Sequence, residues 1–488
     1  MKLHHIILLL SLTLLGCGAT RTVIVPRDPL TQLRKNINSI LADSLFIPAR
    51  VSIKVVSLEN GNVLYDHDSK ALMNPGSNVK LLTSAAALSI LDTNYQFKTA
   101  VFVEDSPTDG ILAGNIYVKG YGDPDLKTSD LDSLANSVRR MGITSIEGNI
   151  IVDDSFFDDN YWGAGWTWDD ESDPDAPYIN ALSVNKNCIS ITLLADSTTI
   201  YPYVEPMTDF VTVINRAKLT TDSIRTPLKI KRLYLNNPNT ILTEGELSLF
   251  SQITQKFSLR RPEYYTGTLL KESFRHAGIF VYGNVVNGVT PIGLREIAQH
   301  YQPIEKMITN MNKVSDNLSA ENALKVLGTT MNGVPGSAKS GIFVIKRFLS
   351  NLGIDTSKLS IVDGSGVSRY NLLSADQLVQ FLTVMYKQPR IFPIFYNSLP
   401  LAGVDGTLAR RMTTYPAACN LRAKTGTLNG VSCLSGYVLT RDGEMLVFSM
   451  MMQNFITSVT NYQQVQDRIG ALLAGFSRRN TNQQGLVK

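Results

Sequence analysis

Strand-like segments fill the middle of this chain and helical segments lie toward both ends, and this arrangement limits the folds open to it. Between about residues 98 and 299, alternating apolar and polar residues are separated by turns rich in Gly, Asn and Asp. Apolar runs with helical character lie on either side of this block. We therefore predict that residues 31–97 and 300–488 form one helix-bearing domain, which is interrupted by a β-rich insertion.

The length and composition fit this layout. A chain of 488 residues is long enough for roughly three domains. We expect the insertion to hold an outer unit, residues 98–182 and 271–299, and a nested unit, residues 183–270. Hydrophobic residues make up 44% and charged residues 18%, which excludes a disordered chain and a multi-span membrane protein. The net charge of +4, without a block of like charges, makes nucleic acid an unsuitable partner.

The first sixteen residues have the pattern of an export signal. The apolar run over residues 6–15 is too short to span a bilayer and fits the central part of a secretory signal. The run ends in Leu-Leu-Gly-Cys17, which resembles the lipobox of bacterial lipoproteins, in which the cysteine is lipidated. An ordinary signal peptide with an incidental cysteine is the alternative.

On the lipoprotein interpretation, the signal covers residues 1–16 and is removed, and a lipid on Cys17 anchors the protein to a membrane. Residues 17–30 then form a tether between the anchor and the fold. We expect an exported bacterial lipoprotein on the periplasmic side, and Gly18 after the cysteine favours the outer membrane.

The candidate base of an active site is a lysine rather than a histidine. Two of the five histidines lie in the signal and the other three are isolated, so neither a zinc site nor a histidine base is expected. Ser77 and Lys80 open an apolar helix, and residues three apart share one helical face. Burial favours the neutral form of a lysine, which can accept the serine proton. The helix start also supplies backbone N–H donors for an oxyanion at Ser77.

A second Ser-x-x-Lys sequence, Ser183 to Lys186, shows that this spacing alone carries little weight. It precedes a strand-like segment instead of opening a helix, so its side chains are expected to diverge. We therefore predict that only the first of the two sequences is catalytic.

Two more motifs follow in the chain. Ser315-Asp316-Asn317 lies at a loop-to-helix boundary, and Lys424-Thr425-Gly426-Thr427 precedes two apolar segments separated by a turn, as at a strand that borders a hairpin. A rival Lys339-Ser340-Gly341 leads into a helical run and lacks this setting. Ser-x-x-Lys, Ser-x-Asn and Lys-Thr-Gly in this order are the active-site set of serine penicillin-recognising enzymes.

More of the chain resembles one branch of these enzymes, the D-alanyl-D-alanine carboxypeptidase/endopeptidases of the low-molecular-mass class C penicillin-binding proteins. The resemblance extends over nearly the whole mature chain, and its members carry a large insertion between the first two motifs. It implies the α/β transpeptidase fold shared by penicillin-binding proteins and β-lactamases, an antiparallel sheet flanked by helices. The segments that carry it are 74–80, 121–124, 363–369, 398–403, 405–408 and 423–427.

The resemblance assigns roles to the motif residues. Ser77 attacks the carbonyl of the penultimate D-alanine and forms an acyl-enzyme, with Lys80 as the base. Ser315 relays a proton between Lys80, Lys424 and the leaving amine. Asn317 hydrogen-bonds Lys80 and the substrate backbone.

The Lys-Thr-Gly segment binds the substrate on this assignment. Lys424 and Thr425 bind the terminal carboxylate, and Gly426 lies on the same strand. The backbone N–H groups of Ser77 and Thr427 form the oxyanion hole, so Thr427 contributes by its position.

Some members of the branch recognise the free end of a diaminopimelate side chain with an Asp and an Arg. The matching positions here are Asp153 and Arg369, and Asn429 replaces the glutamine expected beside them. A carboxylate and a guanidinium together suit an aminocarboxylate group. Asp154 is a rival to Asp153, and a capping Asp with a surface Arg is the alternative interpretation.

The implied function is a serine D-Ala-D-Ala carboxypeptidase or DD-endopeptidase that acts on peptidoglycan stem peptides. β-Lactams are its expected covalent inhibitors, no metal or organic cofactor is needed, and the oligomeric state stays open. A β-lactamase shares the motifs but must deacylate quickly. A catalytically inactive peptidoglycan-binding envelope protein is the non-enzymatic alternative, and the intact motifs argue against it.

Aromatic residues gather in a Gly-rich loop of the insertion at Tyr161, Trp162, Trp166 and Trp168. They could form a platform for a sugar or peptide, but we favour packing beneath a long loop.

Overall fold

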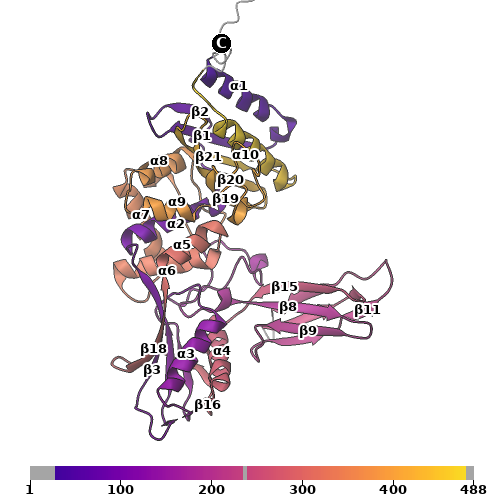
Figure 1. Ribbon diagram of the computed structural model, residues 1–488, viewed down its shortest axis with the longest axis vertical. Helices are drawn as coiled ribbons and strands as arrows, with labels where there is room; N and C mark the ends of the chain where they lie inside the picture. The colour runs from indigo at the N-terminus through magenta and orange to yellow at the C-terminus, as the bar shows by residue number, and fades with distance from the viewer. Residues whose placement is uncertain (1–27, 235–238, 480–488) are drawn as a thin grey trace, which may run out of the picture.

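The computed structural model describes residues 28–234 and 239–479 and has an elongated shape (Figure 1). A part made of helices and a sheet lies at one end, and a β-rich part lies at the other, with a further sheet projecting to the side. The predicted signal and Cys17 lie outside the described residues. Along the described ranges, no helix combines the length and the apolar character that crossing a membrane requires.

Both ends of the chain contribute to one five-stranded antiparallel sheet, in the order β19-β20-β21-β1-β2. The N-terminal β1 pairs along its whole length with β21, so that Ile53 lies opposite Met450. The two ends must therefore fold together. The strands are β1 (Arg50–Ser57), β2 (Val63–His67), β19 (Arg422–Leu428), β20 (Val431–Leu439) and β21 (Met445–Gln453).

This sheet separates two hydrophobic cores, as period-two alternation requires. On β21, Val447 and Met451 join one core, whereas Phe448 and Met450 join the other. The second core is covered by α1 (Pro29–Leu41) and α10 (Val459–Ala474). The first core holds the remaining helices of this part, namely α2 (Val79–Ile90), α5 (Ile304–Lys313), α6 (Asn317–Asn332), α7 (Ala338–Asn351), α8 (Ala375–Tyr386) and α9 (Phe392–Ser398).

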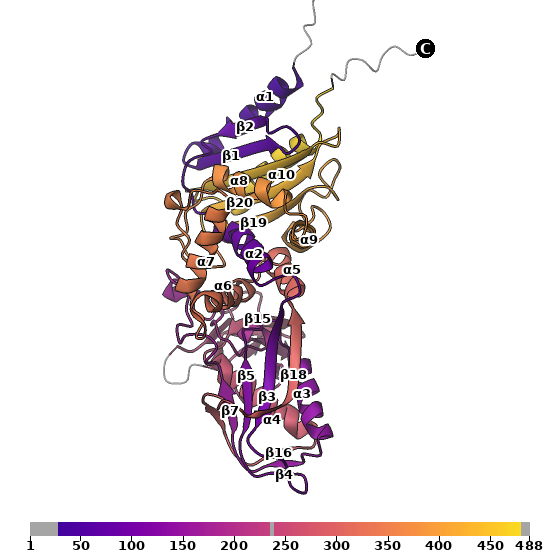
Figure 2. The ribbon, with the colours of Figure 1, turned by 90° about the vertical axis from the view of Figure 1, so that its left-hand side faces the viewer.

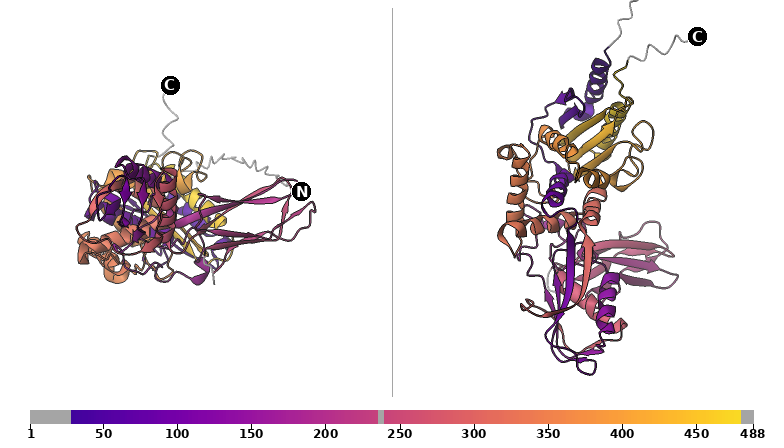
Figure 3. Two further views of the ribbon diagram at one scale, coloured as in Figure 1. Left: turned by 90° about the horizontal axis from the view of Figure 1, so that it is seen from below. Right: turned by 60° about the vertical axis from the view of Figure 1, so that its left-hand side comes forward.

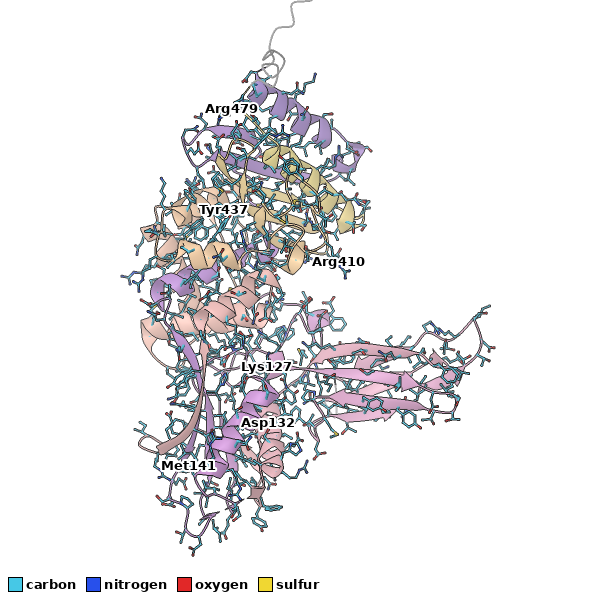
Figure 4. All side chains as sticks on the ribbon, viewed as in Figure 1. Lys127, Asp132, Met141, Arg410, Tyr437 and Arg479 are labelled. Atoms are coloured by element: carbon cyan, nitrogen blue, oxygen red, sulfur yellow. The ribbon has the colours of Figure 1, made fainter. Side chains whose placement is uncertain are left out.

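Helix α2 lies at the centre of these helices (Figure 2). Its residues are buried almost all round, including Lys80, and the run Ala85-Ala86-Ala87 lets the neighbouring helices approach closely. Tyr437 on β20, which is marked in Figure 4, lies in the same part of the molecule. Its hydroxyl donates a hydrogen bond of 2.8 Å to the carbonyl of Leu382 on α8.

The chain enters and leaves the insertion through two long antiparallel strands, β3 and β18 (Figure 2). They form the edge of a five-stranded sheet, β17-β7-β5-β3-β18, beside a small three-stranded sheet, β16-β6-β4. The members are β3 (Gln96–Val103), β4 (Ile111–Leu112), β5 (Ile116–Gly120), β6 (Ser145–Ile146), β7 (Ile150–Asp153), β16 (Phe280–Val281), β17 (Val285–Asn287) and β18 (Arg295–Pro303).

Two helices in this block were not predicted. They are α3 (Thr128–Arg140) and α4 (Pro262–His276), which pack on each other and on the sheet. Figure 4 shows Lys127 and Asp132 at the start of α3, near the base of the projecting sheet.

The nested unit is the projecting sheet seen from two further sides in Figure 3. It contains two three-stranded sheets, β15-β8-β9 and β10-β13-β12, and the two-stranded sheet β11-β14. The predicted boundary at residue 270 is wrong, because it cuts α4, which packs against α3 and β7 of the outer unit. The strands are β8 (Cys188–Ala195), β9 (Ile200–Glu205), β10 (Thr212–Asn215), β11 (Lys218–Thr220), β12 (Lys229–Arg232), β13 (Thr240–Glu244), β14 (Glu246–Ser248) and β15 (Gln252–Ser258).

The predicted tether also needs a correction at its end. Residues 29 and 30 belong to α1, because Asp28 caps that helix by accepting a hydrogen bond of 3.0 Å from the backbone N–H of Thr31. Pro29 occupies the first helical position, where its missing N–H costs nothing.

Candidate active site

Ser77 lies in a single turn of 3-10 helix, Gly76–Asn78, that leads directly into α2. This turn lies close against β19, and both contacting positions favour glycine, since Gly76 has a backbone φ of 50° and a Cβ atom at Gly426 would lie 2.5 Å from the carbonyl oxygen of Pro75. A Cβ atom at Gly76 would lie 3.2 Å from the backbone carbon of Gly426, and one at Gly426 would lie 3.1 Å from the nitrogen of Ser77. The contact brings Ser77 and Thr427, whose backbone N–H groups are predicted to form the oxyanion hole, to the lining of one cleft.

Lys80 is fully buried and surrounded by neutral acceptors. Its Nζ donates hydrogen bonds to Ser77 Oγ at 3.0 Å, to Asn317 Oδ1 at 2.5 Å and to the carbonyl of Ser365 at 2.6 Å. Burial lowers the pKa of Lys80 to about 8, although nearby carboxylates act in the opposite direction. A usable fraction of Lys80 is therefore neutral near neutral pH, in contact with the hydroxyl whose proton it would accept.

A second buried pair lies across the cleft. Lys424 Nζ on β19 donates to Ser315 Oγ at 2.9 Å and to the carbonyl of Thr425 at 3.0 Å. Burial lowers the pKa of Lys424 well below its usual range, and the charge of Lys80 lowers it further. Ser315 has a backbone φ of 64°, which is a strained conformation for a residue other than glycine. It lies in the turn just before α6 begins at Asn317.

The cleft between these groups has a volume of about 350 Å³. Thr425 Oγ1 on its wall is 2.8 Å from Thr407 Oγ1. In the described part of the chain, no cluster of three or more His, Cys, Asp or Glu side chains could hold a metal ion. The cleft is lined by Ser77, Asp170, Asp173, Asp175, Ala176, Val314, Ser315, Asn317, Val367, Thr407, Thr425, Thr427 and Leu428.

One wall of the cleft comes from the insertion. Trp166 Nε1 donates to Asp363 Oδ2 at 3.0 Å, and Asn317 Nδ2 donates to the carbonyl of Asp175. The ring centroids of Trp162 and Trp166 lie 5.2 Å apart in an edge-to-face arrangement. These two rings therefore pack beneath the loop, whereas Trp168 is 80% exposed.

Comparison with known proteins agrees with this arrangement. A family model described as the D-Ala-D-Ala carboxypeptidase 3 (S13) family matches residues 33–475. The chain belongs to this family. Its membership confirms the predicted family and the predicted class of enzyme, a serine-type D-Ala-D-Ala carboxypeptidase.

Individual relatives cover most of the chain. It is 32% identical over 487 residues to a D-alanyl-D-alanine carboxypeptidase of an Actinomadura species, covering 96% of this chain and 89% of the relative. It is 27% identical over 429 residues to the D-alanyl-D-alanine carboxypeptidase DacB of Haemophilus influenzae, covering 86% of this chain and 89% of the relative.

The fold matches a solved structure. The crystal structure of penicillin binding protein 4 from Haemophilus influenzae superimposes with a TM-score of 0.80 at 24% identity, covering 90% of this chain and 99% of that one. The same protein in complex with a β-lactam gives a TM-score of 0.74 at 23% identity, over 89% of this chain and 98% of that one. The predicted α/β transpeptidase fold with a large insertion is confirmed.

The residues predicted to bind a diaminopimelate side chain have these partners in the structure, and their role in substrate binding stays a prediction. Asp153 is buried at the end of β7, where Lys119 Nζ and the backbone N–H of Thr290 lie 3.0 Å and 2.7 Å from its Oδ2. Although burial opposes them, hydrogen bonds from Ser155, Thr290 and Lys119 hold the pKa of Asp153 below its usual value. Asp153 therefore does not line the cleft.

The rest of that predicted pocket lies elsewhere. Exposed Arg369 donates from Nη2 to the carbonyl of Asn429 at 3.1 Å, so these two residues do meet. Asp154, the rival to Asp153, accepts hydrogen bonds from Asn180 at 2.7 Å and Asn287 at 3.0 Å. Three carboxylates that line the cleft were not predicted from the sequence, namely Asp170, Asp173 and Asp175. The acidic run that follows Trp168 in the sequence could have indicated them.

The second Ser-x-x-Lys sequence has a structural role. Ser183 Oγ donates a hydrogen bond of 2.8 Å to the carbonyl of Asn180 and not to Lys186. Lys186, at a backbone φ of 60°, pairs with Asp125 and lies 3.0 Å from Asp316 Oδ1. Although burial lowers the pKa of Lys186, these two carboxylates raise it overall, so the ammonium stays charged.

The rival Lys339 lies in the first turn of α7 and does not line the cleft. The structure thus brings Ser77, Lys80, Ser315, Asn317 and Lys424 together and leaves both rival sequences outside.

Proposed function

We propose that this protein hydrolyses D-Ala-D-Ala termini and D-Ala cross-links of peptidoglycan stem peptides through an acyl-enzyme on Ser77. One observation carries the proposal. Buried Lys80, with a pKa lowered to about 8, lies 3.0 Å from Ser77 Oγ and contacts neutral acceptors only.

Acylation follows from these contacts. Lys80 takes the Ser77 proton as Oγ bonds to the carbonyl carbon of the penultimate D-alanine. The backbone N–H groups of Ser77 and Thr427 stabilise the oxyanion. The proton passes through Ser315 to the amine of the last residue as the C–N bond breaks and that residue leaves. Water then attacks the ester, its proton returns to Ser77 Oγ, and the shortened peptide is released.

The same cleft accounts for a preference for the carboxyl-terminal end of a peptide substrate. Lys424 and Thr425 lie on β19 beside Ser315, where a carboxylate next to the scissile bond would bind. A β-lactam offers a carboxylate and a strained carbonyl at a similar separation, so β-lactams are the proposed covalent inhibitors. Arg369, exposed beside Asn429, is proposed to contact the substrate side chain.

Fluorescent penicillin tests this proposal directly. We expect the wild type to be labelled covalently and the Ser77→Ala variant not to be labelled, while Ser183→Ala, its matched control, is labelled like the wild type. Covalent labelling of Ser77→Ala would disprove the assignment of the nucleophile. A wild-type adduct that hydrolyses within milliseconds would favour a β-lactamase over a carboxypeptidase.

We also propose that the protein is an exported lipoprotein anchored through Cys17. The support is the Leu-Leu-Gly-Cys sequence at the end of a short apolar run. Membrane fractionation of the producing bacterium should find the wild type in the membrane and a Cys17→Ser variant out of it. Equal membrane association of both would contradict the proposal.

A further inference from the structure

The carbonyl of Ser365 belongs to a tight loop, residues 363–368, that carries no predicted catalytic side chain. This loop packs against the turn that holds the nucleophile, because a Cβ atom at Gly366 would lie only 2.0 Å from the carbonyl oxygen of Gly76. The position of the loop therefore decides whether its carbonyl can accept the hydrogen bond of 2.6 Å from Lys80 Nζ.

Two carboxylates hold this loop. Asp363 works from inside it, accepting from the backbone N–H groups of Gly366 at 2.8 Å and Ser368 at 2.6 Å. Glu321 works from outside it, on α6. Its Oε1 accepts from the backbone N–H groups of Gly364 at 3.0 Å and Ser365 at 2.8 Å.

Glu321 lies one helical turn after Asn317, and residues four apart on a helix share a face. Asn317 contacts Lys80 directly, and Glu321 contacts it through Ser365. One face of α6 therefore sets two of the three acceptors around the base.

The environment of Glu321 is unusual for a merely structural residue. It is 1% exposed, and along the described residues no Lys, Arg or His forms an ion pair with it. A buried carboxylate without a cation is expensive to maintain. Such a group is a candidate for a role in the reaction.

We propose that Glu321 is a positioning residue for the general base, which fixes the Ser365 carbonyl where it accepts the hydrogen bond from Lys80. This inference rests on the proposed function, since it assigns a second role within the same reaction. Glu321 itself touches neither the nucleophile nor the cleft.

The charge of Glu321 gives the proposal a measurable consequence. The groups that face Lys80 are the carboxylates of Asp363, Glu321, Asp316 and Asp175, which raise its pKa, and the buried Lys424. Burial and the charge of Asp363 raise the pKa of Glu321 to about 7, so it is ionised above that pH. Removing this negative charge destabilises the Lys80 ammonium and makes the neutral base available at lower pH.

Two variants separate the hydrogen bonds from the charge. Glu321→Gln keeps an oxygen acceptor but removes the charge, whereas Glu321→Leu removes both. The matched control is Glu444→Gln, which alters a buried glutamate that pairs with Arg478 at 2.8 Å on the hairpin between β20 and β21. The second-order rate constant for acylation by penicillin is measured from pH 5 to 10 for each protein, with thermal unfolding as a check on the fold.

We expect the midpoint of the acid limb to move to lower pH by about half a pH unit or more in Glu321→Gln. Below pH 7, where Glu321 of the wild type is itself protonated, the two profiles should converge. Its plateau rate should stay within about threefold of the wild type, while the plateau of Glu321→Leu falls about ten- to a hundredfold. The control should match the wild type in both respects.

The inference is overturned if the midpoint of the acid limb, measured above pH 7, is the same in Glu321→Gln as in the control, or if Glu321→Leu keeps the control's plateau rate. Should Glu321→Leu not fold, the profile of Glu321→Gln alone decides. A wild type that is not acylated at all would instead disprove the proposed function, so the two failures are distinguishable.

Discussion

The sequence Ser-x-x-Lys occurs twice in this chain, and the pKa of its lysine is shifted in opposite directions at the two places. Lys80, three residues after Ser77, is fully buried among neutral acceptors, and its pKa is lowered to about 8. Lys186, three residues after Ser183, lies against two carboxylates, and its pKa is raised. Both lysines lose water, so burial alone does not make a base. What separates them is whether a carboxylate reaches the ammonium.

The backbone explains why the two sequences diverge. Ser77 and Lys80 lie where a short turn passes into α2, so both side chains face the same way. Residues 185–187 instead have backbone φ values of 50°, 60° and 54°, which turn Lys186 away from Ser183 and toward α6. There it pairs with Asp316, the residue between the two functional side chains of the Ser-x-Asn motif. The insertion thus supports the catalytic part through a sequence that resembles its active site.

Substituting each lysine by methionine is the strongest way to test this contrast. Lys80→Met should lower the acylation rate constant by about 10²–10⁴ with a small effect on the melting temperature, because it removes the general base. Stopped-flow acylation with a fluorescent penicillin measures the loss. A Lys80→Met enzyme that acylates within tenfold of the wild type would show that another group accepts the proton.

Lys186→Met should act mainly on stability. It leaves the buried carboxylate of Asp125 and the half-buried carboxylate of Asp316 without their cation, at a cost of about 2 kcal/mol in the free energy of unfolding. Urea unfolding measures this cost, and Lys186→Arg should recover part of it. If Lys186→Met unfolds like the wild type, the ion pair is not the support that the structure indicates.

The pH dependence of acylation should follow Lys80. The folded protein binds a proton at Lys80 below a pKa of about 8, and the protonated form cannot act as a base. The rate constant should therefore fall about tenfold for each pH unit below that value and level off above it. Ser183→Ala should give the same profile, and a wild-type rate that stays constant from pH 5 to 8 would contradict the assignment.

The smallest effect is expected at the second serine. Ser183→Ala removes a buried hydrogen bond of 2.8 Å to Asn180 and costs about 1–2 kcal/mol of stability. Its acylation rate should equal that of the wild type. A rate loss comparable to that of Lys80→Met would erase the distinction between the two sequences.

The sequence predicted those features that depend on short motifs and on local periodicity. The order and setting of the three motifs predicted the residues that meet in the cleft, and the helical runs at both ends predicted a domain built from both. The helices α3 and α4 escaped notice inside a block dominated by strand patterns. In α4, Gly267 lowers the helical propensity of the segment. The position has no room for a side chain, because a Cβ atom would lie 2.5 Å from Val152 on β7.

Long-range contacts could not be inferred in the same way. Asp153 has a family precedent as a ligand contact, but its partners Lys119 and Thr290 come from distant strands and loops of the insertion. The acidic run that reaches the cleft around Asp173 is held there by contacts with distant residues, since Trp166 donates to Asp363 and the carbonyl of Asp175 accepts from Asn317. Neither pairing leaves a periodic pattern in the chain.

The shared sheet has a consequence for synthesis. Strand β1 is synthesised long before β21, the strand with which it pairs. The nucleophile is likewise made long before Lys424. The insertion has a hydrophobic core of its own, whereas the hydrolytic site cannot exist until β19, β20 and β21 have been synthesised. A chain that stops before β19 therefore lacks both Lys424 and the strand that pairs with β1, and it cannot assemble the hydrolytic site.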